Sequence, residues 1–413
     1  MTTSGANSGY LGIDTKSIHS AEVKRARYTM RRSIQRMTYA PAEGANGQHR
    51  VCACGRGVRD GQAGISILRR AGGGGARYRG LTACGDVWAC PVCAAKISEV
   101  RRRELQKAIV VANLRGSHAY LLTLTLPHEF GVDLGALMGP FAKALQRLKN
   151  SRGYKAFMER HGRLGQIKAL EVKHGPNGWH PHVHELVIAA PGLLEDTRGL
   201  DDLRAAWVAS LLKSGIGDTS KVSDMLAHAL DLRGGDDAAA YVAKYGHEER
   251  WGMASEMTQW MKKTGGVRGD HFTPFELAAM GAAGDAHARR LFAEYLEAFK
   301  GRRAMTWTRG LRARLLDDEE LTDEQAAALD DPMPDEEHVG HIDLDRYQEI
   351  VARKREGDLL YHVSIWTGPM GQADLDELID GWIDAGPRLS SGAMFTVGHG
   401  LRRLIEVAVA HHA

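Results

Sequence analysis

Hydrophobic and polar positions follow two different periods through the middle of the chain. Apolar residues recur at helical spacing over residues 96–114 and 134–148, which predicts two amphipathic helices. Three shorter runs have the character of strands, at residues 120–126, 166–173 and 182–189. The turn-rich residues 174–178 (HGPNG) join the last two runs and predict an antiparallel hairpin. This order of elements predicts an α+β domain with an antiparallel sheet.

The last of these strands carries histidines on one face. Side chains in a strand alternate between its two sides, so His182 and His184 point the same way, about 7 Å apart. Two such imidazoles can converge on one divalent cation if a neighbouring strand supplies a third ligand. The hairpin places Glu171 opposite or diagonal to the histidine strand, within cross-strand reach. Glu171 is therefore the expected third ligand, with His180 and His174 as rivals.

A pair of tyrosines follows the histidine strand. Tyr241 and Tyr245 lie in residues 241–245 (YVAKY), inside a run with helical character, and a spacing of four puts both hydroxyls on one helix face. Taken alone, His-x-His is also compatible with two surface histidines, and Tyr-x-x-x-Tyr with a half-buried aromatic face. Their joint occurrence in this order indicates a protein that breaks DNA with a tyrosine.

All five cysteines lie in one short stretch of the chain. Cys90 and Cys93 form a Cys-x-x-Cys knuckle, and Cys52 and Cys54 could supply a second pair, with Cys84 as a competing or fifth ligand. In a reducing cytoplasm such clustering favours a metal over disulfides. Because tetrahedral zinc takes four ligands, the cluster predicts a structural Zn²⁺ site in which one cysteine is spare or the site is shared, and His49 could also join.

Composition and charge agree with a DNA-binding protein. The 413 residues are 43% hydrophobic and 25% charged, which is ordinary for a globular protein of two or three domains. No apolar run reaches the roughly 18 residues of a membrane span, and the polar N-terminus lacks the apolar core of a signal peptide. A cytoplasmic protein without membrane contact is expected.

The formal net charge of +3 conceals strong segregation of charge. Residues 24–36 and 143–173 are rich in lysine and arginine, as suits contacts with phosphates. Residues 317–345 contain many acids and neither lysine nor arginine. This acidic stretch reads as a solvated linker or a short exposed helix.

Three motifs occur in an order that resembles a known family, the HUH endonucleases. The match is to the replication initiators, or Rep proteins, of rolling-circle plasmids and small single-stranded-DNA phages. Residues 123–127 (TLTLP) resemble the first motif and residues 180–187 (HPHVHELV) the second. Residues 241–245 resemble the third motif in its two-tyrosine version. Similar cysteine clusters precede the catalytic motifs in actinobacterial-type plasmid Rep proteins.

The resemblance implies a fold and an activity. The fold is a five-stranded antiparallel sheet with the tyrosine helix packed beside the metal strand. The activity is metal-dependent nicking of one strand at an origin, with Mg²⁺ or Mn²⁺. A 5′-phosphotyrosine intermediate forms, a 3′ hydroxyl remains as primer, and the strand is rejoined at termination. The implied partners are origin DNA, as a single strand or hairpin, and the host helicase and DNA polymerase; the oligomeric state stays open.

The same resemblance implies roles for three residues of the tyrosine motif. Tyr245 aligns with the nucleophile of one-tyrosine members. Tyr241 occupies a position where some members have glutamate, so a second tyrosine would allow alternate strand transfers. Lys244 would stabilise the phenolate or hold the phosphate, although it could equally be a solvated helix charge.

These features predict four segments in the chain. They are a basic N-terminal segment (1–48), a Cys-rich zinc-binding module (49–105), an HUH endonuclease domain (106–262) and a mainly helical C-terminal region (263–413) that contains the acidic linker 317–345. Three alternatives remain: a two-tyrosine HUH transposase, a conjugative relaxase, and a non-catalytic zinc-finger DNA-binding regulator. Relaxases usually place the nucleophile before the histidine strand, which disfavours the second.

Overall fold

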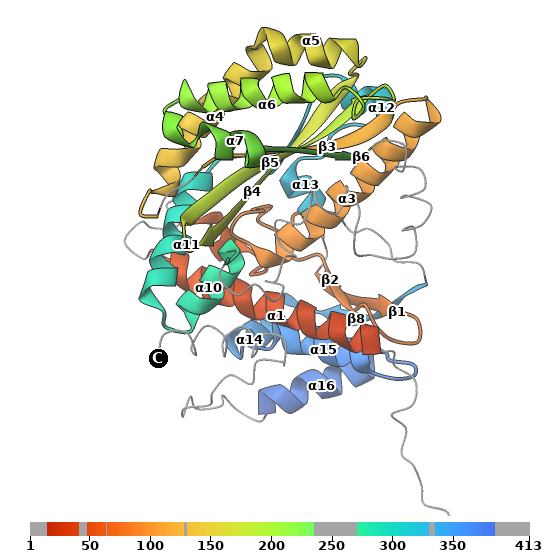
Figure 1. Cartoon of the computed structure of the whole chain (residues 1–413). Coiled ribbons are helices and arrows are strands. Elements are labelled where there is room, and N and C mark those ends of the chain that lie inside the picture. The colour runs from red at the N-terminus through yellow and green to blue at the C-terminus, as the bar shows by residue number, and fades with distance from the viewer. Residues whose placement is uncertain are drawn as a thin grey trace, which may run out of the picture. The chain divides into compact units, whose positions relative to one another are not determined.

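The computed structural model describes residues 15–40, 48–62, 64–127, 130–234, 271–329 and 335–384, and Figure 1 labels its elements. The chain groups into two compact units. We call Ala94–Thr322 the central unit, and Met1–Cys93 together with Asp323–Ala413 the terminal unit. Among the described residues, no helix combines the length and the apolar character that a membrane crossing needs.

The terminal unit joins segments from both ends of the chain in one small antiparallel sheet. The strand order is β2-β1-β8, with β1 at Ile65–Arg70, β2 at Arg77–Arg79 and β8 at Glu336–Ile342. Its helices are α1 (Thr15–Thr38), the 3-10 helix η2 (Arg50–Ala53), α13 (Asp323–Ala328), α14 (Leu344–Ala352), α15 (Glu356–Ile365) and α16 (Gln372–Asp384).

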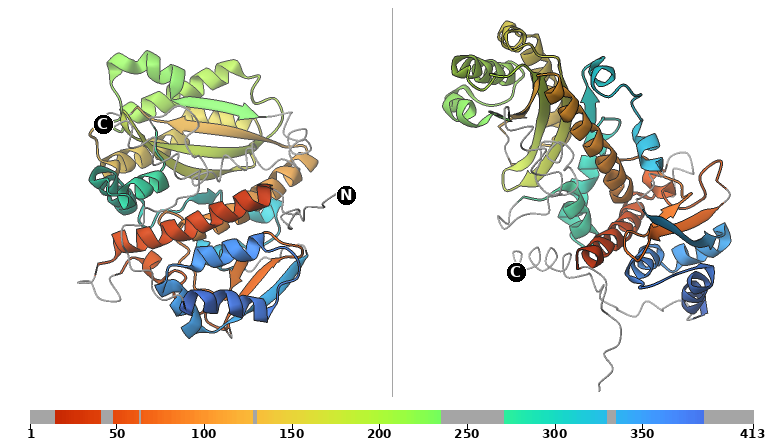
Figure 2. Two further views of the ribbon diagram at one scale, coloured as in Figure 1. Left: turned by 90° about the horizontal axis from the view of Figure 1, so that it is seen from below. Right: turned by 90° about the vertical axis from the view of Figure 1, so that its right-hand side faces the viewer.

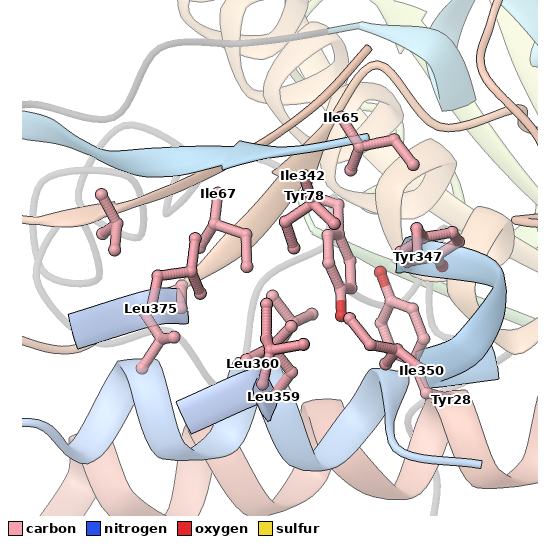
Figure 3. Packing of buried hydrophobic residues seen from close by; sticks show 14 of the residues in the cluster. Tyr28, Ile65, Ile67, Tyr78, Ile342, Tyr347, Ile350, Leu359, Leu360 and Leu375 are labelled. Atoms are coloured by element: carbon pink, nitrogen blue, oxygen red, sulfur yellow. The ribbon is translucent and has the colours of Figure 1, made fainter. Parts of the chain in front are cut away.

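The core of the terminal unit is built by side chains from distant parts of the sequence. Ile67 of β1 packs in one buried cluster with Leu359 of α15 (Figure 3). In the same cluster, the ring centroid of Tyr78 lies 5.9 Å from that of Tyr28 and 5.5 Å from that of Tyr347. Burial of each such side chain contributes roughly 1.5–3 kcal/mol. The first and last parts of the chain therefore depend on each other for a core.

The acidic stretch is not a linker throughout: it contains a short helix, α13, as one of the two expectations had it, and also strand β8, which was not expected. Strand β8 lies within it and pairs with β1. Arg77 holds Glu336 through two hydrogen bonds of 2.6 and 2.9 Å, and the buried Arg69 pairs with Glu337. Arginines far away in the sequence thus neutralise acids that look unpaired locally. The segment after residue 263 is mostly helical as expected, yet it also supplies β7 and β8. The four-segment division itself stays a prediction.

The central unit contains a five-stranded antiparallel sheet, which confirms the expected α+β class. The strand order is β6-β3-β5-β4-β7, with β3 at His118–Thr125, β4 at Gly165–Gly175, β5 at Gly178–Ala189, β6 at Leu230–Gly234 and β7 at Met305–Trp307. Its helices are α3 (Pro91–Leu114), which begins in the terminal unit, α4 (Leu134–Asn150), α5 (Arg152–Arg160), α6 (Thr197–Leu212), η3 (Thr219–Lys221), α7 (Val222–His228), α10 (Pro274–Ala282), α11 (Ala286–Phe299) and α12 (Leu311–Leu315).

A tight turn sets the register of the two longest strands. Gly175 pairs with Gly178, which leaves a loop of only Pro176 and Asn177 between β4 and β5. Gly178 has a φ of 85°, a conformation that glycine adopts without steric cost. The expected hairpin is therefore present, with a shorter connector than residues 174–178. Strand β5 lies in the middle of the sheet, between β3 and β4.

Helices α4, α5 and α6 cover one face of this sheet, as Figures 1 and 2 show. The indole nitrogen of Trp207 in α6 donates to the carbonyl oxygen of Thr125 at 2.9 Å. The Trp207 ring packs against Phe141 of α4, with 6.1 Å between the ring centroids. The covered face is the one to which Glu185 of β5 points, because Lys149 of α4 reaches that carboxylate at 2.7 Å.

Glu185 is a fully buried charge in the central strand. Besides the ion pair with Lys149, it accepts a hydrogen bond of 2.9 Å from the side chain of Gln166 on β4. Tyr154 of α5 donates to Gln166 at 2.8 Å, and burial raises the pKa of Tyr154. A buried carboxylate is tolerated only when such partners satisfy it. The network therefore fastens the helical layer to the middle of the sheet.

We expect Lys149→Met to destabilise the protein by about 2–3 kcal/mol, because the substitution leaves the buried Glu185 carboxylate without its cation. The value lies below that for a fully buried pair, since the Lys149 side chain is 33% exposed. Chemical denaturation measures the loss. The double variant Lys149→Met/Glu185→Gln should recover part of it. Equal stability of Lys149→Met and the native chain would contradict the role of the pair.

Candidate metal centres

Three metal-binding side chains meet on the face of the sheet that points away from helices α4, α5 and α6. Glu171 of β4 lies directly opposite His182 of β5 in the register, and His184 follows two residues later on the same side. Oε2 of Glu171 is 3.1 Å from Nε2 of His182 and 3.3 Å from Nε2 of His184. All three residues are buried, with 5–8% exposure. We call these residues the Glu–His–His group.

The group suits a divalent cation. Its ligand atoms all lie within 4.8 Å of one another. Adjacent ligands of an octahedral ion with bonds of about 2.1 Å are about 3.0 Å apart, close to the two distances from Glu171. A mixed set of imidazole nitrogen and carboxylate oxygen fits Mn²⁺ and similar ions, and it leaves coordination positions for water or a phosphate oxygen. The three residues expected from the sequence therefore form a chemically suitable site.

A threonine on the neighbouring strand orients one of the histidines. Thr123 of β3 lies opposite His184, and its hydroxyl oxygen is 3.0 Å from Nδ1 of that ring. Metal binding through Nε2 requires the tautomer with hydrogen on Nδ1, and the hydroxyl can accept that hydrogen. The sequence motif included Thr123 without giving it this role, although strand alternation could have placed it beside His184.

The rival third ligands lie elsewhere. His174 projects to the other face of β4 from Glu171, because odd and even positions alternate. Its ring centroid lies 5.0 Å from that of Trp179, and burial is the main cause that lowers its pKa, followed by the charges of His287 and His271. The ring of His180 lies 5.5 Å from that of His182, but His180 is not among the ligand atoms that converge.

Four of the five cysteines form a second compact group, the cysteine cluster. Its members are Cys54, Cys84, Cys90 and Cys93. Sγ of Cys54 lies 3.6 Å from that of Cys90 and 3.5 Å from that of Cys93, and Cys84 lies 3.7 Å from Cys93. A zinc tetrahedron with Zn–S bonds of about 2.3 Å has sulfur–sulfur edges of about 3.8 Å. The cluster therefore matches the shape of a tetrathiolate metal site.

Cys52 does not belong to this cluster, and Cys84 takes the fourth place. Cys52 and Cys54 are two residues apart around η2, so their side chains point in different directions. The Cys52 sulfur instead lies 3.5 Å from the Thr38 hydroxyl oxygen and 3.7 Å from the Gln35 carbonyl oxygen. Hydrogen bonds from the other thiols, from Cys84 first, hold the pKa of Cys54 well below its usual range. The arrangement thus favours thiolate at Cys54.

A buried arginine adds positive charge beside the cluster. Arg31 of α1 is 2% exposed, and its charge also lowers the pKa of Cys54. Glu356 pairs with Arg31 at 3.2 Å and with Arg32 at 2.5 Å. One carboxylate between two guanidinium groups leaves a net positive charge in a buried place, which is costly unless it is compensated. A metal bound by four thiolates carries the negative charge that would compensate it.

The tyrosine motif lies outside the described residues. Tyr241, Lys244 and Tyr245 all fall in the segment 235–270, so the structure does not test their expected roles. The description ends at Gly234 in β6 and resumes at His271.

Two curated proteins are similar to this chain. One is "Protein rep" of Streptomyces lividans, which is 29% identical over a match that covers 60% of this chain and 67% of that protein. The other is "Neomycin resistance protein" of Streptomyces cyanogenus, which is 31% identical over 34% of this chain and 37% of that protein. The chain thus spans about two thirds of one relative and little more than a third of the other. No protein-family model matches the chain, and no solved structure matches it.

We expect Thr123→Val to weaken Mn²⁺ binding at the Glu–His–His group by about 10- to 100-fold, because the His184 ring loses the partner that orients it. Isothermal titration calorimetry measures the affinity. Thr125→Val is the matched control, since the Thr125 hydroxyl donates to the backbone of His228 and not to a histidine ring. Equal affinities in the two variants would rule out this role for Thr123.

We expect Cys84→Ser to lose tightly bound zinc and Cys52→Ser to retain it, because only Cys84 belongs to the cysteine cluster. Elemental analysis of the purified protein gives the metal content per chain. The opposite pattern, with zinc lost from Cys52→Ser and kept in Cys84→Ser, would show that the ligands were assigned wrongly.

Proposed function

We propose that this chain is a plasmid rolling-circle replication initiator that nicks origin DNA with a tyrosine. The observation that carries the proposal is the convergence of Glu171 with two histidines of the central strand. The order of the three sequence motifs and the similarity to a protein named Rep support it. The proposed substrate is a single-stranded or hairpin segment of the origin. The host helicase and DNA polymerase are the proposed later partners, in the cytoplasm.

The Glu–His–His group would hold Mg²⁺ or Mn²⁺ and bring the scissile phosphate to the face of the sheet opposite helices α4, α5 and α6. A phosphodiester resists attack because its anionic oxygens repel a nucleophile. A bound divalent cation supplies positive charge that offsets this repulsion. The histidines and the carboxylate are held by paired strands, so the phosphate would be placed with little freedom.

Tyr245 is the proposed nucleophile. Its phenolic oxygen forms a bond to phosphorus while the bond from phosphorus to the 3′ oxygen breaks. The 3′ oxygen takes up a proton and becomes the primer hydroxyl, and the 5′ phosphate stays on the tyrosine. The tyrosine proton passes to a base, for which Asp237, four residues before Tyr241 in the sequence, is a candidate. Lys244 would stabilise the phenolate. Because the phenol has a pKa of about 10, it leaves more readily than a serine alkoxide, so the strand can be rejoined.

The described ends of the tyrosine segment support this assignment. Strand β6 ends at Gly234, at the level of Val187 on β5. Beyond the segment 235–270, Phe272 pairs with His174 of β4, which lies opposite Trp179 of β5. Eight strand residues separate these two levels, which is about 27 Å, and the Glu–His–His group lies between them. The segment that holds both tyrosines is therefore attached on either side of the site. Tyr241 would serve as a second nucleophile in alternate strand transfers.

The cysteine cluster would bind structural Zn²⁺. Four buried thiols at tetrahedral spacing leave no open coordination position, which is typical of structural and not catalytic zinc. Its proposed contribution is to hold α1, the loop around η2 and the start of α3 together.

A nicking assay on supercoiled DNA of the chain's own replicon tests the proposal. With Mn²⁺ or Mg²⁺ we expect a relaxed circle and a covalent protein–DNA adduct on a denaturing gel. Tyr245→Phe should abolish the adduct, because only the hydroxyl is removed, whereas Tyr241→Phe should retain the first cleavage.

An undiminished adduct from Tyr245→Phe would refute the assignment of the nucleophile. Salt-dependent binding without any nick, in supercoiled DNA and in single-stranded origin segments, would favour the non-catalytic regulator. A related two-tyrosine transposase would instead cleave the ends of a mobile element and not a replicon origin.

A further inference from the structure

Helices α4 and α5 present an exposed surface of one sign. Five cations on them are exposed; Arg160 pairs with Asp196, and the other four are Lys143, Arg147, Arg152 and Lys155. We call these four the α4–α5 basic surface. Helix α4 contains no acid, and α5 contains only Glu159. The adjacent α6 differs, because its two arginines are balanced by Asp201 and Asp202.

The fold does not use these charges. Other cations nearby have structural partners: Lys149 pairs with Glu185, and Arg160 pairs with Asp196. None of the four residues of the basic surface forms an ion pair with any residue that the structure describes. The terminal unit contrasts with this, since its arginines Arg69 and Arg77 hold acids of β8. The α4–α5 basic surface is therefore available to bind an anionic partner outside the chain.

Several positions of these cations lower helix stability, although Arg147 also lies in the last turn of α4, where the helix dipole favours a cation. Lys143 and Arg147 are four residues apart, where like charges repel by roughly 0.2–0.5 kcal/mol. Arg152 and Lys155 lie in the first residues of α5, where the positive end of the helix dipole disfavours cations. An anionic partner would relieve both effects, because phosphates neutralise the repulsion and lysine and arginine are the side chains that contact them.

The surface lies on the opposite side of the sheet from the Glu–His–His group. Lys149 of α4 reaches Glu185, whose side chain points away from that of His184, the preceding residue. Helices α4 and α5, which carry this surface, thus lie behind the sheet and not next to the proposed cleavage site (Figure 1). A short strand held at the metal site therefore does not lie on this surface.

We propose that the α4–α5 basic surface binds the phosphates of duplex DNA, separately from the strand that is cut. The choice of DNA rests on the proposed function. Duplex DNA carries one charge per about 1.7 Å of axis and keeps it in a stiff array, so it suits cations that are held on two helices. Such contacts position the protein on DNA and carry no base specificity.

The salt dependence of duplex binding tests the proposal. We expect Arg147→Glu/Lys155→Glu to weaken binding to duplexes of any sequence and to lower the slope of log affinity against log salt by about two, since each lost phosphate contact removes about one. Fluorescence anisotropy between roughly 50 and 200 mM salt measures this. Lys213→Glu/Arg309→Glu is the matched control, because it makes the same charge change at exposed cations of the central unit. Its slope should equal that of the native chain.

Two further measurements keep the test independent of folding and of nicking. The neutral variant Arg147→Gln/Lys155→Gln should show a smaller loss of affinity with unchanged circular dichroism. Cleavage of a short single-stranded origin segment by Arg147→Glu/Lys155→Glu should match the native rate. If the native chain makes no adduct, the proposed nicking fails, while the duplex slope still decides the role of this surface.

Equal slopes in the test and control variants would overturn the proposal. So would an equal loss of affinity for a short single strand, because the surface would then carry the cut strand. A loss of binding to anionic vesicles, with duplex binding unchanged, would assign the surface to a membrane instead.

Discussion

The pairing of β5 with β3 on one side and β4 on the other is the constraint on which the rest of the central unit depends. It brings Thr123 opposite His184 and Glu171 opposite His182, in two neighbouring rows on the same face of the sheet. A shift of one residue in either register would turn these side chains to the helical face and break the group. The two-residue loop after Gly175 fixes one register, and the buried network around Glu185 fastens the strand from behind.

Buried charge is the second theme of the structure, and it occurs in both units. In the central unit one carboxylate in the middle of the sheet is satisfied by Lys149 and Gln166. In the terminal unit two arginines share Glu356 beside four thiols. Both arrangements carry a desolvation cost. The ion pairs and hydrogen bonds offset this cost only when every partner is present. They therefore connect metal chemistry to the folded core, since losing a charge at one place leaves another uncompensated.

Part of the Glu–His–His group and of the cysteine cluster could be predicted from local sequence patterns. Alternation along a strand placed His182 and His184 on one side, and turn residues placed Glu171 on the neighbouring strand. The choice among five cysteines depended on the geometry of η2, which spacing does not reveal. The partnership of Arg31 with Glu356, and of β8 with β1, joins residues from opposite ends of the chain. No local period or motif encodes such pairs, so only the folded structure reveals them.

Pulsed electron paramagnetic resonance of the Mn²⁺-loaded chain tests the central claim most directly. The account predicts one Mn²⁺ at the Glu–His–His group with nitrogen couplings from two imidazoles, and a phosphorus coupling that develops when a single-stranded origin segment is added. His184→Ala should remove one nitrogen coupling. Mn²⁺ without imidazole nitrogen, or with nitrogen but no phosphorus coupling in the presence of that DNA, would contradict the claim that this group holds the scissile phosphate.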